Sequence, residues 1–159
     1  MNNEINITIE IPLGSIEKIE WKPDLNRFDV DRNEPSAFPE PVNYGFISNT
    51  IGGDGDYLDA FIVTNKVFKT GDIIKAKIVG LMKFIDDGDV DDKVVAVMPD
   101  SDARGLDDLD QGIITKIEDY YNHYKDYIKP GITKVLGWGN TTDAVGCIEQ
   151  ASKAWSQKQ

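Results

Sequence analysis

The amino-acid sequence predicts an α+β protein in which a mostly antiparallel barrel or curled sheet carries two helices. Three observations support this fold class. Isoleucines alternate with polar residues near the N-terminus, apolar runs of strand length continue as far as Met98, and the apolar period changes to three and four residues at Ile113. Strands that precede helices in this way are typical of an α+β domain.

The first elements are predicted to be a half-buried strand and a hairpin. Residues 4–11 alternate between isoleucine and polar side chains, which is the pattern of a strand with one buried face. Residues 16–21 and 27–30 are expected to be two further strands, joined by a turn at 23–26. Three prolines within residues 33–43 then favour an irregular, extended loop.

The middle of the chain is predicted to be three more strands. Apolar runs mark strands at 58–64, 73–85 and 93–98, with a turn at 69–72. Gly80 interrupts the longest run, and a glycine inside a strand favours a bulge or a bend.

The C-terminal part is predicted to be a helix, a short strand and a final helix. Apolar and tyrosine side chains repeat at three and four residues from Ile113 to Ile128, and Pro130 ends the pattern. Residues 133–138 form the short strand, and Asn140 can cap the helix that follows. The final helix is expected to bury Ala144, Ile148, Ala151 and Trp155.

Composition excludes several classes of partner. The 159 residues carry a formal net charge of -11 and have a pI near 4.4, which argues against binding to nucleic acid or to anionic membranes. No apolar run reaches the roughly 20 residues of a spanning helix, and the N-terminus lacks the features of a signal peptide. We therefore expect one cytoplasmic domain over residues 1–159.

Scarce histidine and cysteine restrict the chemistry. Cys147 and His123 are the only residues of their kinds, so one chain cannot assemble a zinc site of the Cys/His type. A Ser-His-Asp triad would need His123, and no nucleophile-elbow sequence is present. A metal site here must be built from oxygen, which selects Mg²⁺, Mn²⁺ or Ca²⁺.

Two acidic clusters are each attached to a predicted strand. Asp54, Asp56 and Asp59 lead into the apolar run 60–63, and a second cluster at 86–92 follows an apolar strand. Carboxylates repel one another unless a cation lies between them. The clusters therefore indicate a shared site for divalent cations.

Plainer explanations exist for these charges. An EF-hand loop is excluded because Asp92 and Asp59 stand where that loop needs glycine, and Met98 stands where it needs glutamate. The second cluster could be a solvated acidic turn, and each nearby basic residue alone could be an ordinary surface charge. Taken together, the basic residues would suit a polyanionic substrate bridged to the protein by metals.

Several short blocks then carry a resemblance. They are Glu10-Ile11-Pro12, Lys18-Ile19-Glu20, Asp31-Arg32, Asn43-Tyr44-Gly45-Phe46-Ile47, Asp54-Gly55-Asp56-Tyr57-Leu58-Asp59, Asp86 with Asp91-Asp92-Lys93, and His123-Tyr124-Lys125. With these blocks in this order and spacing, the chain resembles the family I soluble inorganic pyrophosphatases of the compact prokaryotic type. The resemblance extends from about Glu10 to the final helix, and its most specific part is D-G-D-x-x-D with an upstream N-Y-G.

The resemblance implies a five-stranded, OB-like barrel with helices packed on it, and hydrolysis of pyrophosphate to two phosphates. The expected cofactor is Mg²⁺, with several ions in each site and Mn²⁺ as a possible substitute. Asp54, Asp59 and Asp91 would hold the two metals that activate the nucleophile, and Asp56 would accept its proton. The resemblance also implies a homo-oligomer, expected to be a hexamer.

Further roles follow from the same resemblance. Asp86 and Asp91 would bind a metal that arrives with substrate, and Glu20 would reach another metal mostly through water. Phosphate oxygens would be held by Lys18, Arg32, Tyr44, Lys93, Tyr124 and Lys125. Glu20 and Tyr44 are also expected among the catalytic groups, Glu10 would support the set from its edge, and Lys77 is a weaker candidate.

The expected chemistry is physically consistent. Water is a poor nucleophile at neutral pH, but two cations about 3.5–4 Å apart can lower its pKa from 15.7 towards about 7. A nearby carboxylate can then take the proton. Pyrophosphate carries several negative charges, so cations, lysines and an arginine are needed to neutralise it.

Glu40 departs from the family pattern, which usually has tyrosine at this position beside the active site. A carboxylate there would repel phosphate, add a metal ligand or turn outward. This residue favours an alternative function, a catalytically impaired relative that binds divalent metal or phosphate ligands. An unrelated acidic calcium-binding module is a third possibility.

Overall fold

The computed structural model describes residues 3–33 and 38–159, apart from the side chains of residues 32 and 33. The strands are β1 (Glu4–Ile11), β2 (Glu17–Lys22), β3 (Arg27–Asn33), β4 (Asn43–Ile47), β5 (Leu58–Ile62), β6 (Ile73–Asp86), β7 (Asp89–Val90), β8 (Lys93–Val97) and β9 (Thr133–Gly139). The helices are the short 3₁₀ helix η1 (Leu106–Asp108), α1 (Gln111–His123) and α2 (Thr141–Lys158). No helix in these described ranges is both long and apolar enough to cross a membrane.

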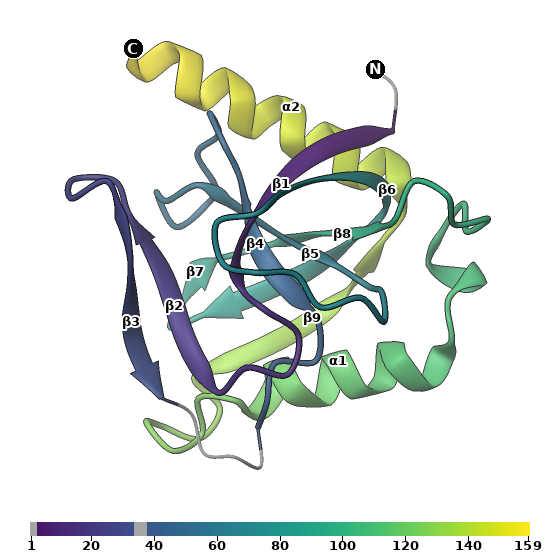
Figure 1. Cartoon of the computed structure of the whole chain (residues 1–159), viewed down its shortest axis with the longest axis horizontal. Coiled ribbons are helices and arrows are strands. Elements are labelled where there is room, and N and C mark those ends of the chain that lie inside the picture. Colours follow the sequence, from purple (N-terminus) through teal and green to yellow (C-terminus); the bar gives the residue numbers. More distant parts are fainter. Residues whose placement is uncertain (1–2, 34–37) are drawn as a thin grey trace.

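Five strands pair into a closed ring (Figure 1). Their order is β1-β4-β5-β8-β6, and the pairing of β6 with β1 closes the ring. Strands β5 and β8 run parallel, whereas every other neighbouring pair in the ring is antiparallel. The predicted α+β fold, a mostly antiparallel, OB-like ring of five strands with two α-helices, is confirmed.

The predicted N-terminal hairpin is also confirmed. Strands β2 and β3 form a separate two-stranded sheet that stands beside the ring (Figure 1). Asn26 in the turn has a φ of 50°, a conformation that asparagine tolerates better than most residues. Of the predicted loop at 33–43, residues 34–37 lie outside the described residues, and its two ends belong to β3 and β4.

The hydrophobic core lies on both faces of the sheet, because α1 and α2 cover opposite sides of it (Figure 1). Ala60 and Val94 belong to the cluster that includes Ile148 of α2. The next residues along the same strands, Phe61 and Val95, belong to the cluster that includes α1. This double coverage explains why β8 is buried throughout and why all of its residues after Lys93 are apolar.

Strand β4 is not predicted by the local sequence pattern. Asparagine and glycine are depleted in strands, and β4 contains both. The structure gives the reason for the glycine. A Cβ atom at Gly45 would lie 1.9 Å from the backbone oxygen of Thr8 in β1, so only glycine allows the two strands to approach this closely.

The bulge predicted at Gly80 is present in β6, where the register with β8 shifts between Ile78 and Gly80. The glycine also makes room for η1. A Cβ atom at position 80 would lie 2.6 Å from Cγ of Leu106, so a larger residue would force the Leu106 side chain or the strand to shift.

The predicted extension of the first helix to Ile128 is wrong, because α1 ends at His123. The Asp126 carboxylate takes part in two local interactions, pairing with His123 Nδ1 at 2.8 Å and accepting a hydrogen bond from the Gly131 backbone N–H at 3.2 Å. Such side-chain bonds compete with the helical pattern. The final helix begins with the expected cap at Asn140, and Trp155 is only half-buried.

Candidate active site

The parallel pairing of β5 with β8 brings the two acidic clusters together. Asp59 lies opposite Lys93 in this pairing, so the loop before β5 and the turn before β8 reach the same end of the ring. Carboxylate oxygens of Asp54, Asp59 and Asp91 all lie within 4.8 Å of one another. This spacing suits a hard divalent cation, which prefers several carboxylate oxygens as ligands.

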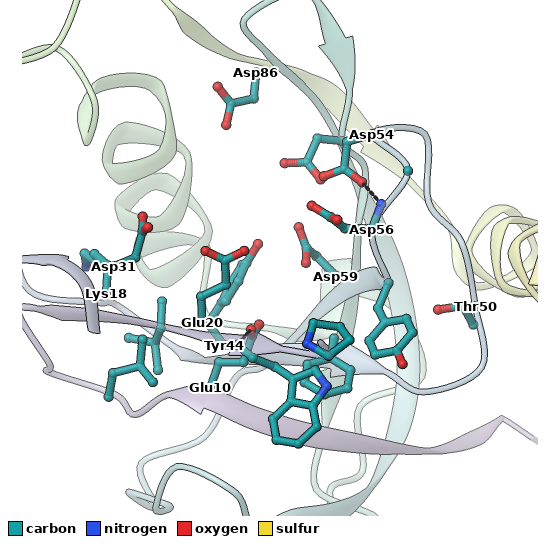
Figure 2. A pocket seen from close by; sticks show the side chains of 18 of the residues that line it. Glu10, Lys18, Glu20, Asp31, Tyr44, Thr50, Asp54, Asp56, Asp59 and Asp86 are labelled. Atoms are coloured by element: carbon teal, nitrogen blue, oxygen red, sulfur yellow. Dashed lines mark hydrogen bonds between the residues drawn. The ribbon is translucent and has the colours of Figure 1, made fainter. Parts of the chain in front are cut away.

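The loop at 50–57 is shaped by its own hydrogen bonds. Gly55 has a φ of +91°, which favours glycine, and the Asp54 carboxylate accepts a hydrogen bond of 3.0 Å from the Asp56 backbone N–H. At the base of the loop, the Thr50 hydroxyl donates to the Ile47 carbonyl and accepts from the Leu58 N–H. The loop thereby presents the carboxylates of Asp54 and Asp56 toward the space shared with Asp59 and Glu20 (Figure 2).

Lys93 is the counter-charge of this acidic group. Its side chain is only 1% exposed, and Nζ lies 2.9 Å from Asp59 Oδ2 and 3.1 Å from Asp91 Oδ2. It also donates a hydrogen bond of 2.9 Å to the Tyr44 hydroxyl. Burial by itself lowers the pKa of Lys93, but Asp59 and Asp91 outweigh burial and raise it above the ordinary lysine value. One lysine faces three clustered carboxylates, so negative charge remains in excess.

The acidic side chains resist ionisation in the absence of a cation. Burial raises the pKa of Asp91 to about 9, and it also raises the pKa of Asp54 and of Asp56 above the ordinary aspartate value. For Glu10, burial and then the charge of Asp59 raise the pKa to about 8. A bound cation would reverse this effect by favouring the charged carboxylates.

A cavity of about 410 Å³ opens over these groups. Its lining includes all of the predicted site residues whose side chains the structure describes, except the weaker candidate Lys77 and Lys93, which lies just behind it. These lining residues are Glu10, Lys18, Glu20, Tyr44, Asp54, Asp56, Asp59, Asp86, Asp91, Tyr124 and Lys125. These residues come from five strands, two loops and the segment that follows α1, and they meet around one space.

Charged pairs line the cavity on its remaining sides. The Lys125 ammonium donates a hydrogen bond to Asp86 Oδ2 at the end of β6. On β2, Lys22 Nζ lies 2.9 Å from Glu20 Oε2. The Glu10 carboxylate accepts a hydrogen bond of 2.8 Å from the backbone N–H of Trp21 and so connects β1 to β2.

Two predicted basic residues are not among the described lining of the cavity. The side chain of Arg32 lies outside the described residues, although its backbone belongs to β3 opposite Lys18. Lys77, the weaker candidate, does not line the cavity and instead donates a hydrogen bond to the Ser101 carbonyl. Its position on the part of β6 that pairs with β1 explains this difference.

The environment of Glu40 differs from what the sequence predicts. The carboxylate does not turn outward and does not join the group of Asp54, Asp59 and Asp91, because it is buried and binds Lys18, Tyr120 and Tyr121. The two tyrosines were predicted only as members of the apolar face of α1. A pair of adjacent tyrosines at the buried face of a helix carries two hydroxyl groups that need partners, and this was the available signal.

Known proteins share both the sequence and the fold of this chain. A family model described as "Inorganic pyrophosphatase" matches residues 7–156. The inorganic pyrophosphatase of Neisseria meningitidis serogroup B is 45% identical over 159 residues, which cover 97% of this chain and 90% of the relative. The Haemophilus influenzae enzyme is 44% identical with the same coverage.

A solved structure gives the same result. The crystal structure of an inorganic pyrophosphatase from Neisseria gonorrhoeae superimposes with a TM-score of 0.94 at 44% sequence identity, covering 98% of this chain and 92% of that one. The inorganic pyrophosphatase of Helicobacter pylori superimposes with a TM-score of 0.91 at 32% identity, covering 97% and 94% of the two chains. The chain belongs to the inorganic pyrophosphatase family of enzymes.

Proposed function

We propose that this protein hydrolyses inorganic pyrophosphate to two phosphates in a reaction that depends on Mg²⁺. The observation that carries the proposal is the grouping of Asp54, Asp59 and Asp91, whose carboxylate oxygens lie within 4.8 Å of one another beside a cavity lined with lysines. The cavity thus offers sites for cations and for a polyanion side by side.

The residues of the cavity fit hard cations. Asp54, Asp59 and Asp91 would hold Mg²⁺ or, as a substitute, Mn²⁺, because both prefer oxygen ligands. Asp86 would share a further ion with Asp91, and Glu20 would reach another through water. When bound, these cations supply Lewis-acid activation of a water molecule and neutralise charge on the phosphate oxygens.

Asp56 would accept the proton from the attacking water. It lies in the same loop as Asp54 and points into the space shared with Asp59 and Glu20 (Figure 2). Burial raises the pKa of Asp56 above the ordinary value, which moves it toward the range of an effective general base.

The phosphate groups would be held by cationic and hydroxyl side chains around the cavity. The lysines act as point charges, and the guanidinium of Arg32 could bind two oxygens at once. Lys93 already pairs with Asp59 and Asp91, so a bound cation would compete with it and free its ammonium for phosphate. The proposed phosphate ligands are Lys18, Arg32, Tyr44, Lys93, Tyr124 and Lys125.

One assay tests this function. Phosphate release from pyrophosphate is measured with Mg²⁺, with and without chelator, for the wild type, Asp56→Asn and the exposed control Asp107→Asn. We expect turnover that chelator abolishes and that Asp56→Asn lowers by about 10²- to 10⁴-fold. Metal binding without turnover in the wild type would instead support a catalytically impaired protein.

The environment of Glu40 weakens the argument that this protein is a catalytically impaired relative. The carboxylate is directed into the protein and is not a member of the group formed by Asp54, Asp59 and Asp91. It therefore neither adds to the acidic group nor removes a ligand from it.

We further propose that the chain acts as one domain in a cytoplasmic homo-oligomer, with the hexamer expected from the family resemblance. Several large apolar side chains on the described surface could be buried in an interface between subunits. Among them are Ile73, Leu136 and Val67, which are 67%, 56% and 63% exposed. Sedimentation velocity would measure the assembly directly, and a monomer at micromolar concentration would contradict it.

A further inference from the structure

A buried ion pair forms part of the cavity wall. Lys18 Nζ lies 3.3 Å from Glu40 Oε2, and the two side chains are only 3% and 2% exposed. Both residues line the same cavity as the acidic group. Charges that are shielded from water to this degree interact more strongly with a neighbouring anion than charges in bulk water do.

Two tyrosines of α1 complete the arrangement around Glu40. The Tyr121 hydroxyl donates to Glu40 Oε1 at 2.6 Å, and the Tyr120 hydroxyl donates to Oε2 at 3.1 Å. Lys18 also donates to the Tyr120 hydroxyl, and its Nζ lies 5.0 Å from the centre of that ring. We call Lys18, Glu40, Tyr120 and Tyr121 the Glu40 network.

The backbone of Glu40 is fixed as firmly as its side chain. Its N–H donates to the Ser15 carbonyl at 2.9 Å, and its carbonyl accepts from the Gly14 N–H at 2.8 Å. Ser15 and Gly14 belong to the connection between β1 and β2. Because Glu40 is held at both ends, its carboxylate cannot easily swing away when a ligand approaches Lys18.

The network therefore restricts what Lys18 can offer to phosphate. An ammonium group has three N–H donors, and within the described part of the chain Glu40 and Tyr120 accept two of them. The third is left for the cavity. The nearby carboxylate also offsets the positive charge that a phosphate group in the cavity would experience.

We propose that Glu40 is a positioning residue that limits the strength with which Lys18 binds phosphate. The inference rests on the proposed function, in which each turnover leaves two phosphate ions to be released. Product release limits the rate of many enzymes, so a weaker phosphate site favours turnover. Glu40 keeps Lys18 in place and keeps its affinity for phosphate moderate.

Glu40→Gln tests the proposal, because the carboxamide keeps the shape and removes the charge. Binding of inorganic phosphate is measured by calorimetry with saturating Mg²⁺, and KM and kcat are measured for pyrophosphate. We expect phosphate to bind about five- to tenfold more tightly and KM to fall by a similar factor, with kcat unchanged or lower. The matched control is Glu149→Gln, which removes an exposed glutamate from α2 and should alter neither value.

A double-mutant cycle tests whether Glu40 acts through Lys18. Once Lys18 is replaced by methionine, a buried carboxylate without a counter-charge takes up a proton. Glu40→Gln should then have no further effect on phosphate binding in the Lys18→Met background. Additive effects, a rise in KM, or unchanged phosphate affinity in Glu40→Gln would each overturn the proposal.

Glu40→Asp covers the case in which Glu40→Gln does not fold. It keeps the charge but moves the carboxylate back from Lys18 by one methylene, so phosphate should bind about two- to threefold more tightly. Phosphate binding requires no turnover, which separates the two proposals. A wild type without pyrophosphatase activity contradicts the proposed function alone, whereas turnover with unchanged phosphate affinity in both variants contradicts this inference alone.

Discussion

The acidic group, formed by Asp54, Asp59 and Asp91, and the Glu40 network are two charged regions of one cavity. They differ in whether their positive and negative charges balance. In the acidic group, Lys93 is the described counter-charge for the carboxylates of Asp54, Asp59 and Asp91. In the Glu40 network, one ammonium meets one carboxylate, and two tyrosine hydroxyls bind that carboxylate as well. A region with unbalanced charge needs a ligand, whereas a balanced one holds its shape without a ligand.

The largest effect is expected from Asp91→Asn. It removes one of the three clustered carboxylates, and losing a cation site forfeits several kcal/mol of transition-state stabilisation, or about 10³-fold in turnover. Steady-state hydrolysis of pyrophosphate as a function of Mg²⁺ measures this loss. Asp100→Asn, an exposed aspartate outside the cavity, should remain near the wild-type rate. Equal activity in both variants would remove the acidic group from the mechanism.

Breaking the Glu40 network from one side should destabilise the fold. Lys18→Met leaves Glu40 buried without its counter-charge, which typically costs about 3–5 kcal/mol in the free energy of unfolding. The double variant Lys18→Met/Glu40→Leu should recover much of this loss, because both charges are gone. Urea denaturation of the metal-free protein distinguishes the two cases. Equal stability of the single and the double variant would show that the loss does not come from the unpaired charge of Glu40.

The acidic group should exchange protons for cations. In the folded state, burial raises the pKa of Asp91 from 3.8 to about 9 and, together with Asp59, that of Glu10 from 4.5 to about 8. Between these values the folded protein holds more protons than the unfolded chain, so the stability of the metal-free protein should fall as pH rises through this window. Mg²⁺ should flatten the dependence in thermal unfolding at pH 5 to about 9, because it replaces the protons.

Proton release upon Mg²⁺ binding provides a direct measurement of the same exchange. Calorimetric titrations at neutral pH in two buffers with different ionisation enthalpies should give different apparent binding enthalpies. Identical enthalpies would mean that the carboxylates are already ionised before the cation arrives.

The smallest effect is expected from Tyr121→Phe. It removes the 2.6 Å hydrogen bond to Glu40 Oε1 and leaves a buried acceptor with one partner fewer, at a cost of about 1–3 kcal/mol in the free energy of unfolding. Tyr57→Phe is the control, because this ring packs against Phe46 and Trp155 through its faces and edges. Its stability should change by less than about 0.5 kcal/mol. Chemical denaturation of both variants would show whether the hydroxyl of Tyr121 matters.

Local patterns in the sequence were sufficient for most of the fold. The alternation at 4–11, the hairpin, the bulge at Gly80 and the cap at Asn140 all depend on residues close to one another in the chain. Strand β4 could not be predicted in this way, since Gly45 is required by a contact with Thr8, 37 positions earlier in the numbering.

The same distinction holds for the site. The acidic clusters were visible as clusters, but their meeting depends on the parallel pairing of β5 with β8, which no local pattern indicates. The environment of Glu40 was even harder to predict. Its partners Tyr120 and Tyr121 belong to α1 and follow it by 80 and 81 residues. Long-range packing therefore decides which charged residues are balanced.

Side chains of β5 point alternately into the core beneath α2 and toward the face that carries Asp59, so changes in one affect the other. Leu58, Ala60 and Ile62 enter the cluster beneath α2, while Asp59, between them, faces the cavity. A single-residue insertion or deletion in this strand would turn the carboxylate into the cluster beneath α2 and move the aliphatic side chains to the face that now carries Asp59 and Phe61. Lineages can therefore replace individual side chains here, but they cannot change the length of the strand without losing both function and foldability in one step.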